Sequence, residues 1–371
     1  AALNANDKAE QLKTAIEAME QEVDLFYQHK GFSKKAGNGD TNRYPSQRLN
    51  IRYQTMFSGA FMYAMSQHIG IEYGSAGELF KLSPVQTDEK GNKLSGKLSG
   101  WGIAHEIGHV INNKKYATAE ITNNYYSILS TGDVRSNYEG SVYPAVTGKS
   151  ADGATALAMY WQLHMFYDEY GDYKMFDEAN DQLANLFFDR MDAYSRKPAS
   201  APTPEGGTAL TLCNSKTDNL VRLACAAAQK DLTDFFDAWG KHYNEETEAY
   251  AEQFPKETHK IQYFSPAARK YKLSGGSGMP SGTVVTTDAE NGIQYKKGSN
   301  QVTLNLGCSA NADVMLGYEI IRNGKAVAFV PAGTSSYTDT VTTGNNRVYD
   351  YEIIAYDKLL NATEVKKLKP V

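Results

Sequence analysis

Two histidines four residues apart, His105 and His109, have the types and spacing that could bind a metal. On a helix this spacing places both imidazoles on one face, and two neutral imidazoles make half of a tetrahedral zinc site. Glu106 follows the first histidine, so its carboxylate would lie beside the metal, where it can take a proton from a zinc-activated water. The pattern His-Glu-x-x-His is short and also occurs by chance on amphipathic helices. Its surroundings therefore decide its meaning.

A carboxylate in a suitable place follows the histidine pair. The sequence predicts a second helix over about residues 118–129, with Glu120 in its first turn, from which it can reach back to the metal. The position six residues after His109 is Lys115, which rules against the three-histidine arrangement of the metzincins. A His-His-Glu site, the gluzincin arrangement, fits better. Asn124, one turn beyond Glu120, is placed either to support a ligand or to cap the local backbone.

The residues around the pair predict the helix that must position it. Gly100 and Gly102 interrupt the chain just before the pair. The polar residues 112–115 end the helix with two lysines, where a helix C-terminus favours cations. Apolar packing would come from Ile103, Ala104, Ile107, Val110 and Ile111.

The segment before this helix predicts a helix and a small sheet. Residues 5–30 show the apolar spacing of an amphipathic helix, and the alternation after Arg48 predicts a strand. Residues 58–63 predict a second strand, which at a sheet edge could hold an extended peptide by strand addition. Gly59 and Ala60 would then let a bulky substrate approach, although a simple core hairpin explains the segment equally well. The apolar positions of the helix are Leu12, Ile16, Met19, Val23 and Phe26.

Further candidate residues follow the metal helices. Asp133, Arg135 and Tyr138 lie in a polar, glycine-punctuated segment and are candidates for substrate contact, or simply parts of an exposed loop. The helical region 151–195 contains Tyr160 and His164, which are candidates for stabilising the oxyanion of an acyl-transfer reaction. Core packing is the simpler explanation for both.

The C-terminal part has a different pattern. Residues 274–278 (SGGSG) predict a flexible linker, and beyond it short segments alternate with a period of two. Asn323-Gly324 predicts a hairpin turn between two of these segments. Residues 279–371 should therefore form an all-β sandwich, and the stretches GYEIIRNGK and YDYEIIAYD resemble a fibronectin type III module. It would serve as a spacer or a binding accessory.

The bulk properties exclude some classes of function. The chain has 371 residues, which predicts two or three domains, and a net charge of −5 without a basic run, which argues against nucleic-acid binding. No apolar run is long enough to span a membrane. Cys213 and Cys225 could close a small disulfide loop, leaving Cys308 unpaired, or all could be free thiols. The opening residues show no Met and no signal peptide, which is typical of a piece excised from a longer chain.

The stretches WGIAHEIGH (residues 101–109) and AEITNNYYS (119–127) resemble the enhancin-like, mucin-targeting zinc metallopeptidases, a gluzincin family of O-glycopeptidases. Residues 48–63 and 159–163 resemble that family's upstream strand pair and downstream helix, so the likeness covers roughly residues 20–250. The resemblance implies that His105, His109 and Glu120 bind one catalytic Zn²⁺ and that Glu106 is the general base. It also implies a secreted or cell-surface enzyme of bacterial type.

Together these observations predict an α+β fold with a gluzincin-type domain over residues 1–273, mostly helical from about residue 102, followed by the linker and the β-sandwich. The resemblance implies hydrolysis of peptide bonds in mucin-type O-glycosylated proteins, with the glycan as part of what is recognised. Two alternatives remain: a gluzincin peptidase without a glycan requirement, and a non-catalytic glycan-binding adhesin. Glu106 argues against the adhesin, and the distance of the cysteines from His105 argues against a structural zinc site. The oligomeric state is not predicted.

Overall fold

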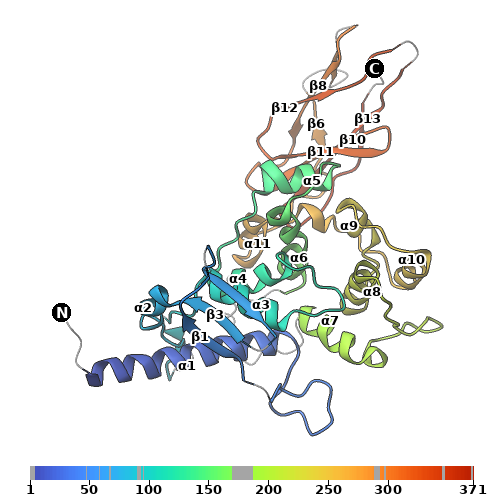
Figure 1. Cartoon of the computed structure of the whole chain (residues 1–371). Coiled ribbons are helices and arrows are strands. Elements are labelled where there is room, and N and C mark those ends of the chain that lie inside the picture. The colour runs from blue at the N-terminus through green and yellow to red at the C-terminus, as the bar shows by residue number, and fades with distance from the viewer. Residues whose placement is uncertain are drawn as a thin grey trace. The chain divides into compact units, whose positions relative to one another are not determined.

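The computed structural model describes residues 5–371 apart from 47, 58, 67, 90–92, 95, 169–186, 288–292, 296–297, 345–346 and 369–370. Figure 1 shows the course of the chain, a mixed α+β arrangement. By their contacts the residues form two compact units: unit 1 comprises Ala1–Arg135, Tyr167–Thr233 and His242–Lys256, and unit 2 comprises Ser136–Phe166, Asp234–Lys241 and Glu257–Val371. The predicted domain boundary at 274–278 is a different division and stays a prediction. None of the described helices combines the length and the apolar character needed to cross a bilayer.

Unit 1 begins with a long helix and a three-stranded sheet. Helix α1 (Ala5–His29) is followed by strands β1 (Asn50–Gln54), β2 (Met62–Met65) and β3 (His68–Glu72) in the order β1-β3-β2. Strand β1 pairs in parallel with β3, and β2 pairs antiparallel with it. The strand predicted after Arg48 is confirmed, and the predicted alternation holds at its start, where Ile51 and Tyr53 are half-buried while Asn50 and Arg52 are exposed.

The predicted second strand is shifted along the chain. Strand β2 begins at Met62 and not near residue 58, so Gly59 and Ala60 precede the strand. The reason is the backbone at Gly59, whose φ of 80° lies in the left-handed region and interrupts an extended chain. The expected edge position is confirmed, since β2 pairs only with β3 in the described part of this sheet.

The apolar face of α1 differs in part from the prediction. Phe26 of the predicted stripe is buried, but Leu12 and Ile16 are 37% and 47% exposed, and the fully buried residues nearer the start of the helix are Ala15, Ala18 and Glu22. Small alanine side chains allow neighbouring elements to approach a helix closely, which outweighs the larger apolar area of leucine and isoleucine on the other side.

The other elements of unit 1 are mostly helical. The stretch 81–100 contains a short hairpin, and within the predicted helical region 151–195 residues 169–186 lie outside the described residues. The elements are η1 (Tyr73–Ser75), α2 (Ala76–Leu79), β4 (Gln86–Thr87), β5 (Lys93–Leu94), α3 (Trp101–Ile111), α4 (Thr122–Thr131), α7 (Phe187–Arg196), η3 (Pro198–Ser200), α8 (Lys216–Ala228) and α10 (Glu245–Glu252).

Unit 2 contains short helices, the buried helix α6 (Gly153–Tyr167) and the strands of the C-terminal part. Its other helical elements are η2 (Tyr138–Val142), α5 (Tyr143–Val146), α9 (Thr233–Ala238), η4 (Ile261–Tyr263) and α11 (Pro266–Leu273). Its strands are β6 (Val285–Thr286), β7 (Ile293–Tyr295), β8 (Gln301–Asn305), β9 (Gly307–Cys308), β10 (Met315–Arg322), β11 (Lys325–Pro331), β12 (Ser336–Thr340), β13 (Tyr351–Asp357) and β14 (Lys366–Lys367).

The larger strands of unit 2 form two sheets, in the orders β11-β10-β13-β14 and β12-β8-β7. Apolar side chains from both sheets, such as Leu304 and Ile320, belong to one buried cluster. The predicted hairpin turn is confirmed: Asn323 and Gly324 have φ values of 50° and 75°, and the strands on either side pair. Residues 274–278 are held by contacts, for example by the Tyr271 hydroxyl, which donates to the Ser277 carbonyl at 2.8 Å.

The strands of unit 2 are joined to its helical part by a buried polar group. Glu319 on β10 is 5% exposed, and its carboxylate accepts hydrogen bonds from the hydroxyls of Tyr263 (2.7 Å) and Tyr356 (2.9 Å). The ring of Tyr263 also stacks on Phe329 of β11 at a centroid distance of 4.0 Å.

The three cysteines, Cys213, Cys225 and Cys308, are free thiols, which decides between the two possibilities that the sequence left open.

Candidate metal centre

Helices α3 and α4 bring the predicted ligands together because a glycine lets them touch. A Cβ atom on Gly108 would lie 2.7 Å from the carbonyl oxygen of Asn123 on α4, closer than real Cβ contacts allow. The hydroxyl of Ser127 on α4 donates to the carbonyl of Trp101 at 2.9 Å, which fixes α4 against the start of α3. The predicted extent of the first helix is confirmed, with Gly100 as its N-cap.

The three predicted ligands form one cluster. The carboxylate of Glu120 lies 3.3 Å from Nε2 of His105 and 3.2 Å from Nε2 of His109. These atoms suit a tetrahedral zinc ion, because bonds of about 2.0–2.1 Å give ligand–ligand distances of about 3.4 Å. In the described part of the chain, this is the one group of three or more His, Cys, Asp or Glu side chains that could hold a metal.

Asn124 fixes the protonation of the first histidine. Its Oδ1 lies 2.6 Å from Nδ1 of His105, and its Nδ2 donates to the carbonyl of Glu120 at 2.8 Å. An amide oxygen only accepts, so Nδ1 carries the proton and the lone pair of Nε2 is free for a metal. Both roles that the sequence left open for Asn124, supporting a ligand and bonding the local backbone, are therefore present.

The sequence predicted Glu120 in the first turn of α4, but Glu120 lies before that helix. The helix begins at Thr122, and Glu120 precedes it with a φ of 62°, in the left-handed region. That conformation costs a residue with a side chain roughly 1–2 kcal/mol, because Cβ approaches the carbonyl oxygen. The turn that it makes ends the loop before α4 and directs the carboxylate to the two imidazoles. Strain at a polar residue of this kind is typical of a functional position.

Glu106 is buried beside the cluster, with 8% of its surface exposed. Burial raises the pKa of its carboxyl group, the nearby His105 and His109 lower it, and Glu120 adds a smaller upward effect. A carboxylate whose pKa is raised is a better proton acceptor, which is what a general base requires.

A polar and aromatic cluster lies at the start of the metal helix. The guanidinium of Arg135 lies over the ring of Trp101 at 3.7 Å, and its Nε donates to Asp133 at 2.8 Å. The structure thus brings together two predicted substrate-contact residues and adds Trp101, which the sequence analysis used only as part of the motif. The position of Trp101, one helical turn before His105, was the signal available for it.

The remaining candidates lie in different places. Gly59 is exposed, with open space where a Cβ would be, and Ala60 is half-buried; both belong to unit 1. Tyr138, Tyr160 and His164 belong to unit 2 and are buried, the last two on α6. Their predicted roles in substrate contact and oxyanion stabilisation stay predictions.

The structure also shows a buried carboxyl group that the sequence analysis missed. Glu22 on α1 is fully buried and accepts hydrogen bonds from the backbone N–H of Ser99 (3.3 Å), from the Ser99 hydroxyl and from the Ser130 hydroxyl (2.5 Å). Burial raises its pKa to about 7, against the smaller effect of these bonds. Ser99 lies two residues before the first residue of α3 and Ser130 lies in the last turn of α4, so Glu22 attaches both site helices to α1. Its neighbours in the sequence include Glu20, Gln21 and Asp24, so no local signal marked it as buried.

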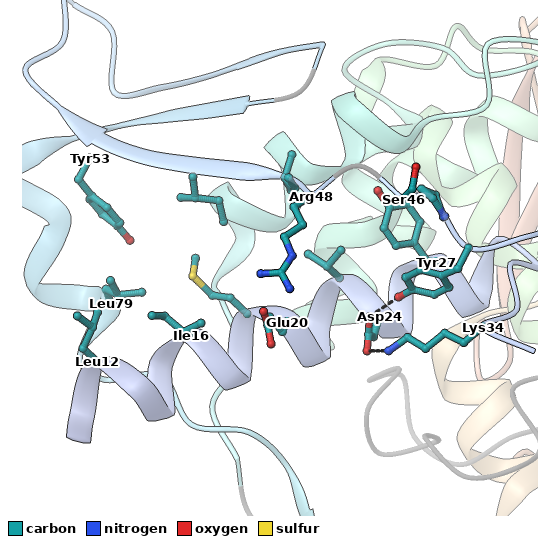
Figure 2. Close-up of a pocket in the computed structure, with 16 residues that line it drawn as sticks. Leu12, Ile16, Glu20, Asp24, Tyr27, Lys34, Ser46, Arg48, Tyr53 and Leu79 are labelled. Carbon is teal, nitrogen blue, oxygen red and sulfur yellow. Dashed lines mark hydrogen bonds and ion pairs between the residues drawn. The ribbon is translucent and has the colours of Figure 1, made fainter. Parts of the chain in front are cut away.

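A hollow of about 640 Å³ lies between α1 and the β1 region. Figure 2 shows Leu12, Ile16, Leu79 and Tyr53 at one end, and Arg48 reaching towards Glu20 in the middle. Lys34 and Tyr44 both donate to Asp24 at the other end. None of the three ligands is among the described residues that line it, so this hollow is separate from the metal centre.

Comparison with known proteins gives a family and a fold. The family model described as Peptidase M60, enhancin and enhancin-like, matches residues 5–240. The chain is similar to the M60 catalytic domain of Clostridium perfringens ZmpC, solved in complex with the sialyl T antigen, with 23% identity and a TM-score of 0.62 over 96% of this chain and 64% of that one. The ZmpB metallopeptidase of the same organism gives 23% identity and a TM-score of 0.63, with coverages of 96% and 63%. The catalytic module of the metalloprotease ZmpA, from the same organism, gives 20% identity and a TM-score of 0.61, over 96% of this chain and 62% of that one.

The chain thus spans less than two thirds of the length of these solved chains, and at such identities the likeness shows the fold. A search of curated proteins found no match. The family model covers well over half of the 371 residues, including both metal helices. The chain belongs to the enhancin and enhancin-like peptidase family M60.

Proposed function

We propose that this chain is a zinc metalloendopeptidase that hydrolyses peptide bonds in mucin-type O-glycosylated proteins outside the cell. The observation that carries the proposal is the cluster of His105, His109 and Glu120, whose separations suit zinc, beside the buried Glu106. Membership of the M60 family supports the peptidase chemistry. One Zn²⁺ would be the cofactor, and it would polarise the scissile carbonyl as a Lewis acid.

The protein groups would move one proton and hold the ligands. Glu106 accepts a proton from the attacking water, whose oxygen bonds to the carbonyl carbon of the scissile peptide. As the C–N bond breaks, Glu106 returns that proton to the leaving amine, so the products are a carboxylic acid and an amine. Asn124 keeps the proton of His105 on Nδ1 throughout, which leaves Nε2 as the ligating atom.

Residues around the centre would recognise the substrate. The exposed groups of Asp133 and Arg135, with the ring of Trp101, offer a carboxylate, a cation and an aromatic face, which are suited to a sugar ring and its hydroxyls. The ZmpC structure was solved with the sialyl T antigen, which supports a glycan as part of the substrate. The free edge of β2, next to Gly59 and Ala60, would hold the peptide main chain.

The roles of the residues in unit 2 are proposed on weaker grounds. Tyr138 would contact substrate, and Tyr160 or His164 would stabilise the oxyanion. The C-terminal strands 279–371 would form a fibronectin type III-like sandwich that acts as a spacer or binding accessory, which the two sheets with their common apolar cluster support.

The test is cleavage of one O-glycosylated mucin-like peptide and of its unglycosylated twin, by the zinc-loaded wild type and by Glu106→Gln. The proposal predicts that the wild type cuts the glycosylated peptide alone and that the variant cuts neither. Equal cleavage of both peptides would leave a gluzincin peptidase without a glycan requirement. Zinc binding and glycopeptide binding without any cleavage would instead favour the adhesin.

A further inference from the structure

Several large apolar side chains beside the free edge of β2 are exposed. Phe61 directly precedes the strand and Met65 ends it, and they are 57% and 59% exposed. Phe57, four residues before Phe61, is 68% exposed. Single exposed apolar residues are common on protein surfaces, but several together at one edge are typical of a binding surface. We call Phe57, Phe61, Tyr63 and Met65 the outer strip.

The outer strip lies on the face of the sheet that is turned away from the metal helix. Side chains alternate along a strand, so the strip residues of β2 share one face and Met62 points to the other. A Cβ on Gly102, the second residue of α3, would lie 2.9 Å from Sδ of Met62, so α3 packs on the face of Met62. The sheet edge therefore separates the strip from the start of α3.

Tyr63 gives the strip a fixed centre. Its ring lies across Gly70 of β3, where a Cβ would come within 2.1 Å of a ring atom. Its hydroxyl lies 3.1 Å from Nε2 of Gln54 and 3.1 Å from Nε2 of His68. Its ring centroid is 6.3 Å from that of Phe57. Packing within the sheet thus explains Tyr63, but it does not explain its exposed apolar neighbours.

The backbone at the edge of β2 can hold a peptide between these two faces. The carbonyl of Phe61 accepts a hydrogen bond from the N–H of Glu72 at 2.9 Å, so the polar backbone groups of Phe61 point to β3. These groups alternate in direction along a strand, so those of Met62 and Ala64 point to the free edge. A peptide that pairs with them as an added strand would place every second side chain against the outer strip and the others on the side of α3.

We propose that Phe61 and Met65 determine specificity by binding an apolar side chain of the substrate, at a residue directly next to the glycosylated one. The inference rests on the proposed function, in which Trp101 and Arg135 bind the sugar. Trp101 begins α3, so a glycosylated residue that reaches it has its side chain on the α3 side of the added strand. Its two neighbours then face the outer strip, and residues two positions away do not. Contact with the strip removes apolar surface of both partners from water, which favours apolar neighbours.

The test compares three peptides that each carry one threonine with the sialyl T antigen, the glycan of the ZmpC complex. The first peptide has serine at all flanking positions, the second has leucine at both neighbours of the threonine, and the third has leucine two positions away on both sides. The zinc-loaded full chain should cleave the second peptide with a kcat/KM about tenfold above that of the first, because one apolar group in a binding site changes this constant by about that factor or more. The third peptide should be cleaved like the first.

The double variant Phe61→Ser, Met65→Ser should lower the ratio of the second peptide to the first from about ten to about one. A ratio of two kcat/KM values from one preparation does not depend on how much of the protein is folded, so a loss of stability alone leaves it unchanged. Phe80→Ser is the matched control, because Phe80 is a 39% exposed phenylalanine of unit 1 that directly follows α2, outside the strip. It should keep the ratio of the wild type.

The inference is overturned if the double variant keeps the wild-type ratio, or if the wild type prefers the third peptide to the second. It also fails, alone, if the wild type cleaves all three glycopeptides equally, which would assign the strip to a partner other than the substrate. If the wild type cleaves none of the three, the proposed function fails and the inference fails with it.

Discussion

Glu22 should make the stability of this protein depend on pH in an unusual direction. Its pKa is raised from 4.5 to about 7, mainly by burial. Between these two values the folded chain holds a proton that the unfolded chain has released. The unfolded state then binds fewer protons, so the free energy of unfolding falls as the pH rises through this range. A pKa difference of this size corresponds to about 3 kcal/mol, at about 1.36 kcal/mol per pH unit.

The perturbation that tests this is Glu22→Gln. Glutamine does not titrate and can still accept from Ser99 and donate to Ser130, so the variant should lack this contribution to the pH dependence. The free energy of unfolding of the variant minus that of wild type should be about 2.5 kcal/mol larger at pH 8 than at pH 5, so the variant gains relative stability as the pH rises. The assay is urea denaturation of both proteins at the two pH values, with a chelator present so that metal binding does not contribute.

Glu17→Gln on the same helix is the control, because its carboxylate is exposed and pairs only loosely with Lys13 at 3.9 Å. It should change the free energy of unfolding by a similar, small amount at both pH values. The reasoning is refuted if Glu22→Gln differs from wild type equally at pH 5 and pH 8. That result would mean that Glu22 is ionised in the fold at pH 5, despite its burial.

Three other predictions concern single substitutions in unit 1. Glu120→Gly should raise the free energy of unfolding of the chelator-treated protein by roughly 1 kcal/mol, because glycine adopts the left-handed backbone without strain. It should also greatly weaken zinc binding. A lower free energy of unfolding would contradict the claim that Glu120 is strained. Gly108→Ala should destabilise by about 1–3 kcal/mol in urea denaturation, because its Cβ would press on Asn123; a neutral effect would show that α3 and α4 can separate without cost. Lys30→Met should lower the free energy of unfolding by about 3–5 kcal/mol, because it leaves the buried carboxylate of Asp192 without the ammonium group now 2.9 Å away. An unchanged midpoint of urea denaturation would contradict this loss of stability.

The candidate metal centre could be predicted from the sequence because its geometry is mostly local. His105 and His109 share a face through their spacing alone, and the next carboxylate in a helical region completes the set. The conformation of Glu120 could not be predicted in the same way. Only the folded loop shows that this residue is left-handed and precedes α4.

The missed residues depend on packing between segments distant in the chain. Glu22 and Ser130 are 108 positions apart, and nothing near either one indicates the other. Gly108 brings α3 close to Asn123 of α4, a contact that no periodicity in either helix predicts. Of the apolar stripe predicted for α1, the fold buries Phe26 but leaves Leu12 and Ile16 partly exposed, and it buries the smaller Ala15 and Ala18. In each case the local pattern gave the element, and the tertiary contacts decided which of its faces is buried.

The central claim is that His105, His109 and Glu120 hold one zinc ion. The most direct measurement is anomalous X-ray diffraction, recorded on both sides of the zinc absorption edge, from crystals grown with Zn²⁺. The account predicts one strong anomalous peak, bounded by Nε2 of both histidines and the carboxylate of Glu120. A crystal with zinc in solution and no peak at these three residues, or with its ordered zinc at a different cluster, would contradict it.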